Sequence, residues 1–387
     1  MSEWKKVTLG EISQTIQTGP FGSQLHQSDY SVIGIPVVMP KDIIAGNIEE
    51  ASIARVEQHH IDRLSRHMIS YGDILYARRG DVGKCAFTKQ NQEGWLCGTG
   101  CLRVTINPDM ANPKFVFFQL QKQETLGWIT NHAIGSTMLN LNTTILSNAP
   151  VEIPSLRIQN RIVEILSRYD SLIENYQKQI KLLEEAAQRL YKEWFIDLRF
   201  PGHENTNIID GVPEGWTPSQ LGQLAEFKRG KTITKKDVID GDIPVVAGGL
   251  EPAYYCNKSN TAERVITISG SGANAGFTRM YFEKVWASDC SFVDVSVTPF
   301  LHFVYCFLKN NKTTIDNLQK GAAQPHVYAK DINSLSICIP IESVLKSFEE
   351  KVSNYFDTTA SLQSQLRLLT EARDRLLPKL MNGEMEI

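Results

Sequence analysis

Two long stretches of the chain carry apolar residues at spacings that alternate between four and three. This period of about 3.5 residues is typical of helices that pack along one apolar stripe, with charged residues and Gln on their other faces. A helix of ~35 residues with this pattern is about 50 Å long. The first stripe consists of Ile162, Leu166, Tyr169, Ile173, Tyr176, Ile180, Leu183, Ala187, Leu190 and Trp194, and the second of Phe348, Val352, Tyr355, Thr359, Leu362, Leu366, Leu369, Arg373, Leu376 and Leu380.

The two stripes match in length and register, which favours their packing on each other as an antiparallel coiled coil. An antiparallel pair would place two globular parts at opposite ends of a rod, related by a pseudo-twofold axis. The alternative is that each helix lies on its own globular part.

An internal repeat supports this reading of the pattern. The segment Leu182 to Leu190, LLEEAAQRL, returns as LLTEARDRL at Leu368 to Leu376, 186 positions later. Near the start of each copy, WKKVTLGEI at Trp4 to Ile12 matches WTPSQLGQL at Trp216 to Leu224 with an offset of 212. The chain is therefore two copies of one unit, the second 26 residues shorter in its middle. Because the two copies match at their ends and differ in the middle, they indicate a common scaffold that carries two different recognition regions.

The globular part of each copy alternates short apolar runs with Gly, Asn and Pro, which predicts a strand-rich α/β mixture. A helix is expected over 112–129 in the first copy and over 299–311 in the second. Strands are expected over 35–40, 72–80, 84–89, 101–106 and 151–154 in the first copy, and over 243–248, 264–269, 291–297 and 335–340 in the second.

These elements predict an α+β fold with two pseudo-repeated α/β domains and two long helices that pack as an antiparallel coiled coil. The segment 199–215 is polar, contains Gly and Pro and lacks periodicity, as a linker does. The predicted divisions are a first domain at 1–155, a first long helix at 156–198, a linker at 199–215, a second domain at 216–341, a second long helix at 342–380 and a tail at 381–387.

Composition is that of an ordinary globular chain, with 42% apolar and 21% charged residues and a net charge of −3. The N-terminal segment lacks the apolar core of a secretory signal, and no apolar run approaches the ~18 residues of a membrane span. Seven cysteines without C-x-x-C spacing indicate reduced thiols in a cytoplasmic protein. The net charge neither indicates nor excludes nucleic-acid binding, which depends on local patches.

Motifs for catalysis are missing from the sequence. The segment NPKF at Asn112 to Phe115 has Lys where an adenine methyltransferase has its second Pro, and it reads as a helix start with Pro at the first position. The segment SGSGANAG at Ser269 to Gly276 reads as a strand–turn–strand, and no phosphate-binding loop occurs. His59, His60 and His67 lack partner ligands in the sequence, so no metal site is expected.

Five segments resemble the specificity subunit of type I restriction–modification systems. They are EWFIDLRFPGHE after the first long helix, VPEGWTPSQLGQL, LLPKLMNGEMEI, TGPFGSQLHQSDY and RGKTIT. The resemblance covers nearly the whole chain, including the order of domain, helix, domain, helix. It implies that each domain reads one half of a split, asymmetric, double-stranded DNA target, and that the helices set the spacer and dock two adenine-N6 methyltransferase subunits. Restriction–translocation subunits would join that core, with S-adenosylmethionine on the methyltransferase and ATP and Mg²⁺ on the translocase.

With this resemblance, basic and polar turns become candidate DNA contacts. Arg78 or Arg229 could pair with guanine, and Asn140 or Gln324 with adenine. The alternative is that these are solvated turns and strand entries. The candidate DNA-binding residues are Gly19, Ser23, Gln24, Lys41, Arg78, Arg79, Lys84, Ser136, Thr137 and Asn140 in the first copy, and Lys228, Arg229, Lys231, Thr232, Ser271, Asn274, Gln324 and His326 in the second.

Two other classes of function compete with this reading. One is a solo methyltransferase or nuclease with its own reader, which the missing cofactor and metal motifs oppose. The other is a protein-binding scaffold that never touches DNA. The sequence does not identify the bases read.

Overall fold

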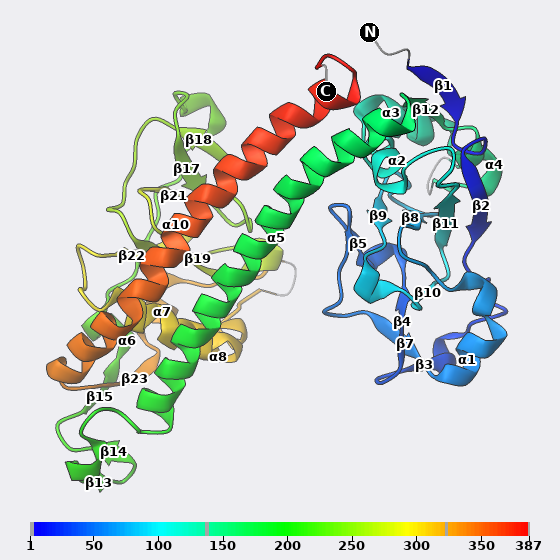
Figure 1. Cartoon of the computed structure of the whole chain (residues 1–387). Coiled ribbons are helices and arrows are strands. Elements are labelled where there is room, and N and C mark those ends of the chain that lie inside the picture. The colour runs from blue at the N-terminus through cyan, green and yellow to red at the C-terminus, as the bar shows by residue number, and fades with distance from the viewer. Residues whose placement is uncertain (1–3, 136–138, 322–323, 386–387) are drawn as a thin grey trace. The chain divides into compact units, whose positions relative to one another are not determined.

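The computed structural model describes residues 4–135, 139–321 and 324–385 (Figure 1). The chain divides into two compact units, the first formed by residues 1–173 and 368–387 and the second by residues 174–367. Each unit therefore contains one globular part together with a segment of both long helices.

The first unit is built on two four-stranded sheets. One is antiparallel and ordered β2-β11-β8-β9, and the other is ordered β10-β4-β7-β3, with β4 and β10 parallel. Two-stranded pairs β1–β12 and β5–β6 complete it. The strands are β1 (Lys5–Thr8), β2 (Ser13–Thr18), β3 (Tyr30–Ser31), β4 (Ile35–Val38), β5 (Ile43–Ile44), β6 (Asn47–Ile48), β7 (Ala54–Val56), β8 (Ile74–Ala77), β9 (Cys85–Phe87), β10 (Leu96–Cys97), β11 (Cys101–Ile106) and β12 (Pro150–Ile153).

The second unit has the same plan in shorter form. An antiparallel sheet is ordered β16-β22-β19-β20, and a three-stranded sheet is ordered β18-β17-β21, with β17 and β21 parallel. The pairs β15–β23 and β13–β14 accompany them. The strands are β13 (Ile208–Ile209), β14 (Val212–Pro213), β15 (Thr217–Gln220), β16 (Lys228–Arg229), β17 (Ile243–Val246), β18 (Tyr254–Cys256), β19 (Val265–Ser269), β20 (Thr278–Tyr281), β21 (Trp286–Ala287), β22 (Cys290–Asp294) and β23 (Ser336–Ile339).

Corresponding strands thus occupy corresponding places in the two units, and the predicted duplication is confirmed at the level of topology. The second copy is shorter mainly between the strands that correspond to β4 and β8, where its described residues form no counterpart of the β5–β6 hairpin. In the same described part, its smaller sheet also lacks a counterpart of the edge strand β3. The segment predicted as a linker contains the β13–β14 hairpin and buries Phe200, which is 2% exposed. The hydrophobic effect explains this burial, because an aromatic ring in a polar segment packs wherever a core is within reach.

The predicted helix over 112–129 is two helices. In α2 (Pro113–Leu120) the six residues from Phe115 to Leu120 are all buried, whereas in α3 (Gln123–His132) only Thr125 and Ile129 are buried. The backbone of Lys122 is extended between them, at ψ 140°. An all-round apolar helix followed by a mostly polar one requires a change of direction. The remaining helices of the globular parts are α1 (Gln58–Arg63), α4 (Thr143–Ser147), α6 (Leu221–Leu224), α7 (Leu301–Asn310), α8 (Lys312–Asn317) and α9 (Ala329–Asn333).

Two smaller expectations are confirmed. Asn112 caps α2, because its side-chain oxygen accepts hydrogen bonds from the backbone N–H groups of Lys114 and Phe115. The Gly-rich segment at 269–276 joins strands β19 and β20 as a turn.

The long helices are α5 (Leu156–Tyr191), which is 36 residues long and continues into a π-helical turn at Lys192–Ile196, and α10 (Glu342–Met381), which is 40 residues long. Their bounds lie close to those predicted from the heptad pattern. Every residue of the two predicted stripes is buried or half-buried, whereas Leu172, Leu182 and Leu368 lie off the stripes and are exposed. No helix among the described residues is both long and apolar enough to cross a membrane.

In the first unit, the start of α5 packs beside the end of α10. Leu380 and Met381 of α10 join Ile162 and Leu166 of α5 in one buried cluster with the core of the globular part. At the end of the helix, the Gln119 amide donates to the carbonyl of Met381 at 3.1 Å. The end of α10 is therefore part of the first core, which contradicts the alternative that each helix lies only on its own domain.

An ionic cluster joins three helices of the first unit. Arg373 of α10 lies 3.4 Å from the carboxylate of Asp170 on α5, and Lys114 of α2 lies 3.7 Å from the same carboxylate. Arg373, a charged residue at a stripe position, thus faces a carboxylate on α5 and also pairs with Asp374 of its own helix at 2.8 Å. The side chains of Arg373, Asp170 and Lys114 are about a quarter exposed, so each pair with Asp170 contributes at most ~1 kcal/mol.

In the second unit, the end of α5 packs beside the start of α10. Phe348 of α10 is fully buried, with ring centroids 5.8 Å from Trp194 and 5.0 Å from Phe195. Phe303 of α7 lies against the same ring. The N-terminal end of one helix thus meets the C-terminal end of the other in each unit, which is the predicted antiparallel pairing.

Candidate nucleic-acid interface

The turn after β8 is the centre of the candidate interface in the first unit. The backbone N–H of Arg78 donates to the carbonyl of Gly100 at 2.8 Å, and the Arg78 carbonyl accepts from Leu141 at 2.8 Å. Arg79 and Asn140 face each other in an isolated β-bridge. Three segments far apart in the sequence are therefore tied together at the end of one strand.

A fourth segment, the loop after β2, lies beside this turn. The N–H of Gly19 donates to the carbonyl of Cys101 at 2.9 Å, and a Cβ at Gly19 would lie 2.1 Å from the carbonyl oxygen of Gly98. Only glycine fits such a close backbone approach. Two residues later, the ring of Phe21 lies 5.6 Å from the Arg78 guanidinium and is 52% exposed. The half-buried Arg78 and the exposed ring of Phe21 together present a charge and a stacking face.

The second unit repeats these backbone contacts, and we call the shared set of hydrogen bonds and the β-bridge the frame. The N–H of Gly270 donates to the carbonyl of Asp289, and the Gly270 carbonyl accepts from Val327, each at 3.1 Å. Ser271 and His326 form an isolated β-bridge where Arg79 and Asn140 form one in the first unit. The backbone frame is thus the same in both units.

The β2 loop also has its counterpart in the second unit, after β16. The N–H of Gly230 donates to the carbonyl of Cys290 at 2.8 Å, and a Cβ at Gly230 would lie 2.3 Å from the carbonyl oxygen of Ser288. A glycine therefore meets the backbone of a neighbouring turn in both units. This shared contact fixes where each loop begins.

Side chains on the shared frame differ completely. Where the first unit presents two arginines, an amide and an aromatic ring, the second presents two hydroxyls, a carboxylate and an imidazole. The corresponding pairs are Phe21 and Thr232, Arg78 and Gly270, Arg79 and Ser271, Gly100 and Asp289, and Asn140 and His326. A constant backbone with variable side chains is suited to presenting different hydrogen-bonding groups to different ligands.

Two polar atoms on the first frame are buried without a hydrogen-bond partner among the described residues. They are Nε of Arg78 and Oδ1 of Asn140. A buried polar atom left unpaired costs about 1–3 kcal/mol, which a ligand that pairs with it restores. The turn therefore carries two polar groups whose hydrogen bonds the described residues leave unsatisfied.

The frames bring together some of the predicted DNA-binding residues. Gly19, Arg78, Arg79 and Asn140 meet in the first unit, and Arg229, Ser271 and His326 line or adjoin one small cavity in the second. Gln24 stands beside the first frame, since its side-chain oxygen accepts from the N–H of Phe21 at 3.1 Å.

Other predicted residues have structural partners elsewhere. Lys41 lies within 3.4 Å of the carbonyl of Ser52, and Lys84 pairs with Asp81 at 3.4 Å. The Asn274 amide reaches the carbonyl of Gly248 at 3.5 Å. Ser23, Lys228, Lys231, Thr232 and Gln324 are exposed. Ser136 and Thr137 lie outside the described residues, and for all of these positions DNA contact stays a prediction.

Sequence reasoning missed Asp289 and Phe21 as members of the frames. Phe21 lies inside a segment that was singled out, and only its position over Arg78 distinguishes it. Asp289 corresponds to Gly100 at an offset of 189, in the region where the second copy has lost residues. Matching the two copies through their hydrogen bonds, rather than through a constant offset, is the signal that finds it.

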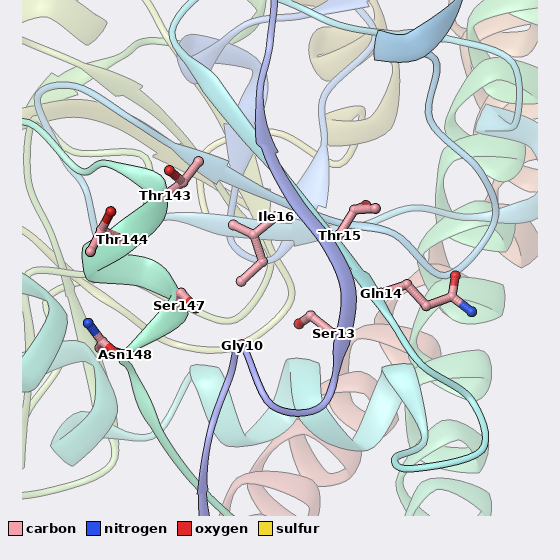
Figure 2. Close-up of a pocket in the computed structure, with 9 residues that line it drawn as sticks. All are labelled: Gly10, Ser13, Gln14, Thr15, Ile16, Thr143, Thr144, Ser147 and Asn148. Atoms are coloured by element: carbon pink, nitrogen blue, oxygen red, sulfur yellow. The ribbon is translucent and has the colours of Figure 1, made fainter.

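A larger groove in the first unit has a different character. Figure 2 shows hydroxyl side chains from β2 and α4 around it, including Ser13, Thr15, Thr143 and Thr144. Its volume is about 390 Å³, and none of the described residues that line it is charged. Hydroxyls can bond to phosphates, but without cations the groove offers no counterion release. It is therefore a weaker candidate than the frames.

Comparison with known proteins agrees with the arrangement of two similar units. A family model described as "Type I restriction modification DNA specificity domain" matches residues 1–185 and 213–369, which is most of the chain.

Two curated relatives are similar over nearly the whole length. The type I restriction enzyme MjaIX specificity subunit of Methanocaldococcus jannaschii is 26% identical over 382 residues, covering 91% of this chain and 87% of the relative. The type I restriction enzyme HindI specificity subunit of Haemophilus influenzae is 22% identical and covers 100% of both chains.

Among solved structures, the S subunit of a type I restriction–modification system from M. genitalium has a similar fold. The TM-score is 0.63 at 17% identity, with 98% of this chain and 96% of that chain covered.

Proposed function

The chain belongs to the type I restriction modification DNA specificity domain family, and we propose that it selects the DNA target of a type I restriction–modification complex. Each unit reads one half of a bipartite, asymmetric target in double-stranded DNA. Sequence is read by side chains that reach base edges, whereas contacts to phosphates position the protein.

One observation carries this proposal above the others. The same backbone frame is present twice, with arginines and an amide on one copy and a hydroxyl, a carboxylate and an imidazole on the other. Identical frames approach DNA in the same way, and different side chains select different bases. A protein with two such frames selects two different half-sites, which makes the target asymmetric.

The long helices are the proposed docking surface for partner subunits. Leu172, Leu182 and Leu368 lie on them with 43%, 52% and 57% of their surfaces exposed. Singly exposed leucines are ordinary on a protein surface, so the docking of partner subunits on these helices is proposed from membership of the family. Two modification methyltransferase subunits dock there, restriction–translocase subunits join the complex, and the length of the helices sets the spacer between the half-sites.

Catalysis belongs to those partners in this proposal. The sequence carries neither a phosphate-binding loop nor a complete adenine methyltransferase motif. S-adenosylmethionine is bound by the methyltransferase subunits, and ATP and Mg²⁺ by the translocase. The complex acts in the cytoplasm, where its DNA lies.

DNA binding in a gel-shift assay tests the proposal directly. The purified chain, with and without its methyltransferase partner, is mixed with genomic fragments and with random-sequence duplexes at several salt concentrations. Affinity for a subset of genomic fragments should exceed that for random duplexes, and its logarithm should fall linearly with the logarithm of salt, by about 0.9 for each phosphate contacted.

The same assay separates the competing functions. A chain that binds no DNA even with its partner is a scaffold, and the proposal then fails. A chain that binds S-adenosylmethionine alone is a solo methyltransferase, which equilibrium dialysis with the labelled cofactor detects.

A further inference from the structure

Asp289 occupies the frame position of the second unit at which the first unit has Gly100. Its carbonyl accepts from the N–H of Gly270, so the residue is held beside the turn after β19. Its side-chain Oδ2 accepts a hydrogen bond from the hydroxyl of Ser271 on that turn. Backbone and side chain therefore fix the carboxylate on the face that carries His326.

The guanidinium-bearing Arg229 lines the same cavity as this carboxylate. Asp289, Arg229 and His326 line one cavity of about 30 Å³. A cavity of this size holds about one water molecule, so it is an edge for hydrogen bonding rather than a pocket for a whole ligand. Arg229 is exposed on β16, at the edge of the same sheet.

Asp289 retains an acceptor for a ligand. Oδ2 takes the Ser271 hydroxyl, and among the described residues no donor pairs with Oδ1. A carboxylate is an acceptor only, with about two sites on each oxygen. On a surface that meets phosphates such a group is repelled, and the repulsion is offset by a nearby cation such as Arg229 and by a hydrogen bond accepted from the DNA.

The major groove offers the matching donors. Cytosine N4 and adenine N6 are exocyclic amines, and aspartate accepts from cytosine N4, whereas arginine pairs with O6 and N7 of guanine. A carboxylate beside an arginine thus fits a cytosine–guanine pair, with one side chain for each base.

We propose that Asp289 is a specificity-determining residue of the second unit, and that its carboxylate selects a base with an exocyclic amine in the major groove. This inference rests on the proposed function of the chain as a DNA reader. Arg229 favours cytosine as that base, because its guanidinium can donate to the guanine that pairs with this cytosine. The frame of the first unit has no acid at Gly100 and presents the donors of Arg78 and Arg79, so the carboxylate acceptor is a feature of the second frame that the first frame lacks.

Selection from a random-sequence duplex library tests the assignment. The full chain with its methyltransferase partner selects DNA, and the bound pool is sequenced for the wild type, Asp289→Asn, Ser271→Ala and Glu283→Gln. Glu283 is an exposed acid of the same unit outside the frame, so Glu283→Gln is the matched loss of one negative charge.

The wild type should prefer an amine-bearing base at one position of one half-site. Asp289→Asn should reduce that preference roughly 5- to 150-fold, because an amide accepts from amines and also donates to keto groups. Ser271→Ala should reduce it less, since the carboxylate loses only the donor that orients it. Glu283→Gln should leave every position as in the wild type.

Two results would overturn the inference, and they are distinguishable. An Asp289→Asn protein that selects the wild-type sequence at every position shows that the carboxylate reads no base, while the proposed function stands. A wild-type complex that selects no sequence at all refutes the proposed function and this inference with it. An unfolding curve for Asp289→Asn that matches the wild type excludes misfolding as the cause of lost selection.

Discussion

Replacing Phe348 by alanine removes the ring at the centre of the helix pairing in the second unit. The side chain is fully buried, and its ring lies 6.3 Å from Tyr191, 5.8 Å from Trp194 and 5.0 Å from Phe195. Tyr191 is the last residue of α5 and Trp194 and Phe195 lie in the π-helical turn that continues it, whereas Phe348 lies near the start of α10. The substitution therefore reports on the antiparallel contact itself.

The expected loss is about 3–5 kcal/mol of unfolding free energy, because a buried Phe→Ala change loses transfer energy and leaves a cavity. Phe277→Ala is the matched control, since that ring is 37% exposed in a loop of the same unit. It should cost less than about 1.5 kcal/mol, because less of its surface leaves water on folding.

Urea unfolding of the full chain, followed by tryptophan fluorescence, measures both changes. Trp194 and Trp216 lie in the core of the second unit and report on its transition. A double-mutant cycle with Phe195→Ala then isolates the contact between the two helices. The edge-to-face geometry, with an interplanar angle of 74°, predicts a coupling of about 0.5–1.5 kcal/mol. Additive losses within ~0.3 kcal/mol would refute the pairing of these helix ends.

Three further predictions concern the frame, the helices and the thiols. Gly230→Ala should destabilise the second unit by roughly 1–3 kcal/mol and weaken DNA binding, because the new Cβ meets the carbonyl of Ser288. Urea unfolding and gel shifts measure these effects, and an unchanged unfolding free energy and DNA affinity would contradict the prediction. Deleting seven matched residues from both α5 and α10 shortens each helix by ~10 Å and should shorten the target spacer by about three base pairs. Methylation mapping that shows an unchanged spacer would disprove the proposal that helix length sets the spacer. Burial raises the pKa of the thiols of Cys85, Cys97 and Cys290 to about 12, so they stay protonated at pH 8 and should react with a disulfide reagent only after unfolding; rapid reaction of all seven cysteines in the native chain would speak against the described cores.

The sequence was most informative where one physical constraint governs many residues. A heptad stripe persists only if it is shielded along its whole length, so the bounds of α5 and α10 could be predicted closely. The duplication was equally visible, because both copies of the frame need the same strands. The break between α2 and α3 was not predicted, since it depends on how deeply α2 lies in the core.

Individual contacts escaped prediction because they are made between segments distant in the chain. Nothing near Arg373 in the sequence shows that Asp170 faces it across the helix pair. Nothing near Asp289 shows that Ser271 donates to it, or that Gly100 is its counterpart. Local sequence patterns indicate which segments are turns, whereas the pairing of the strands determines which turns lie next to each other.

Exchange of one reader tests the central claim, that one frame present twice carries two independent readers. Residues 1–150 are replaced by the corresponding segment of a relative with a different target, and methylated adenines are mapped in DNA modified by the reconstituted complex. The account predicts that one half of the target changes while the other half keeps its sequence. A change in both halves, or in neither, would contradict it.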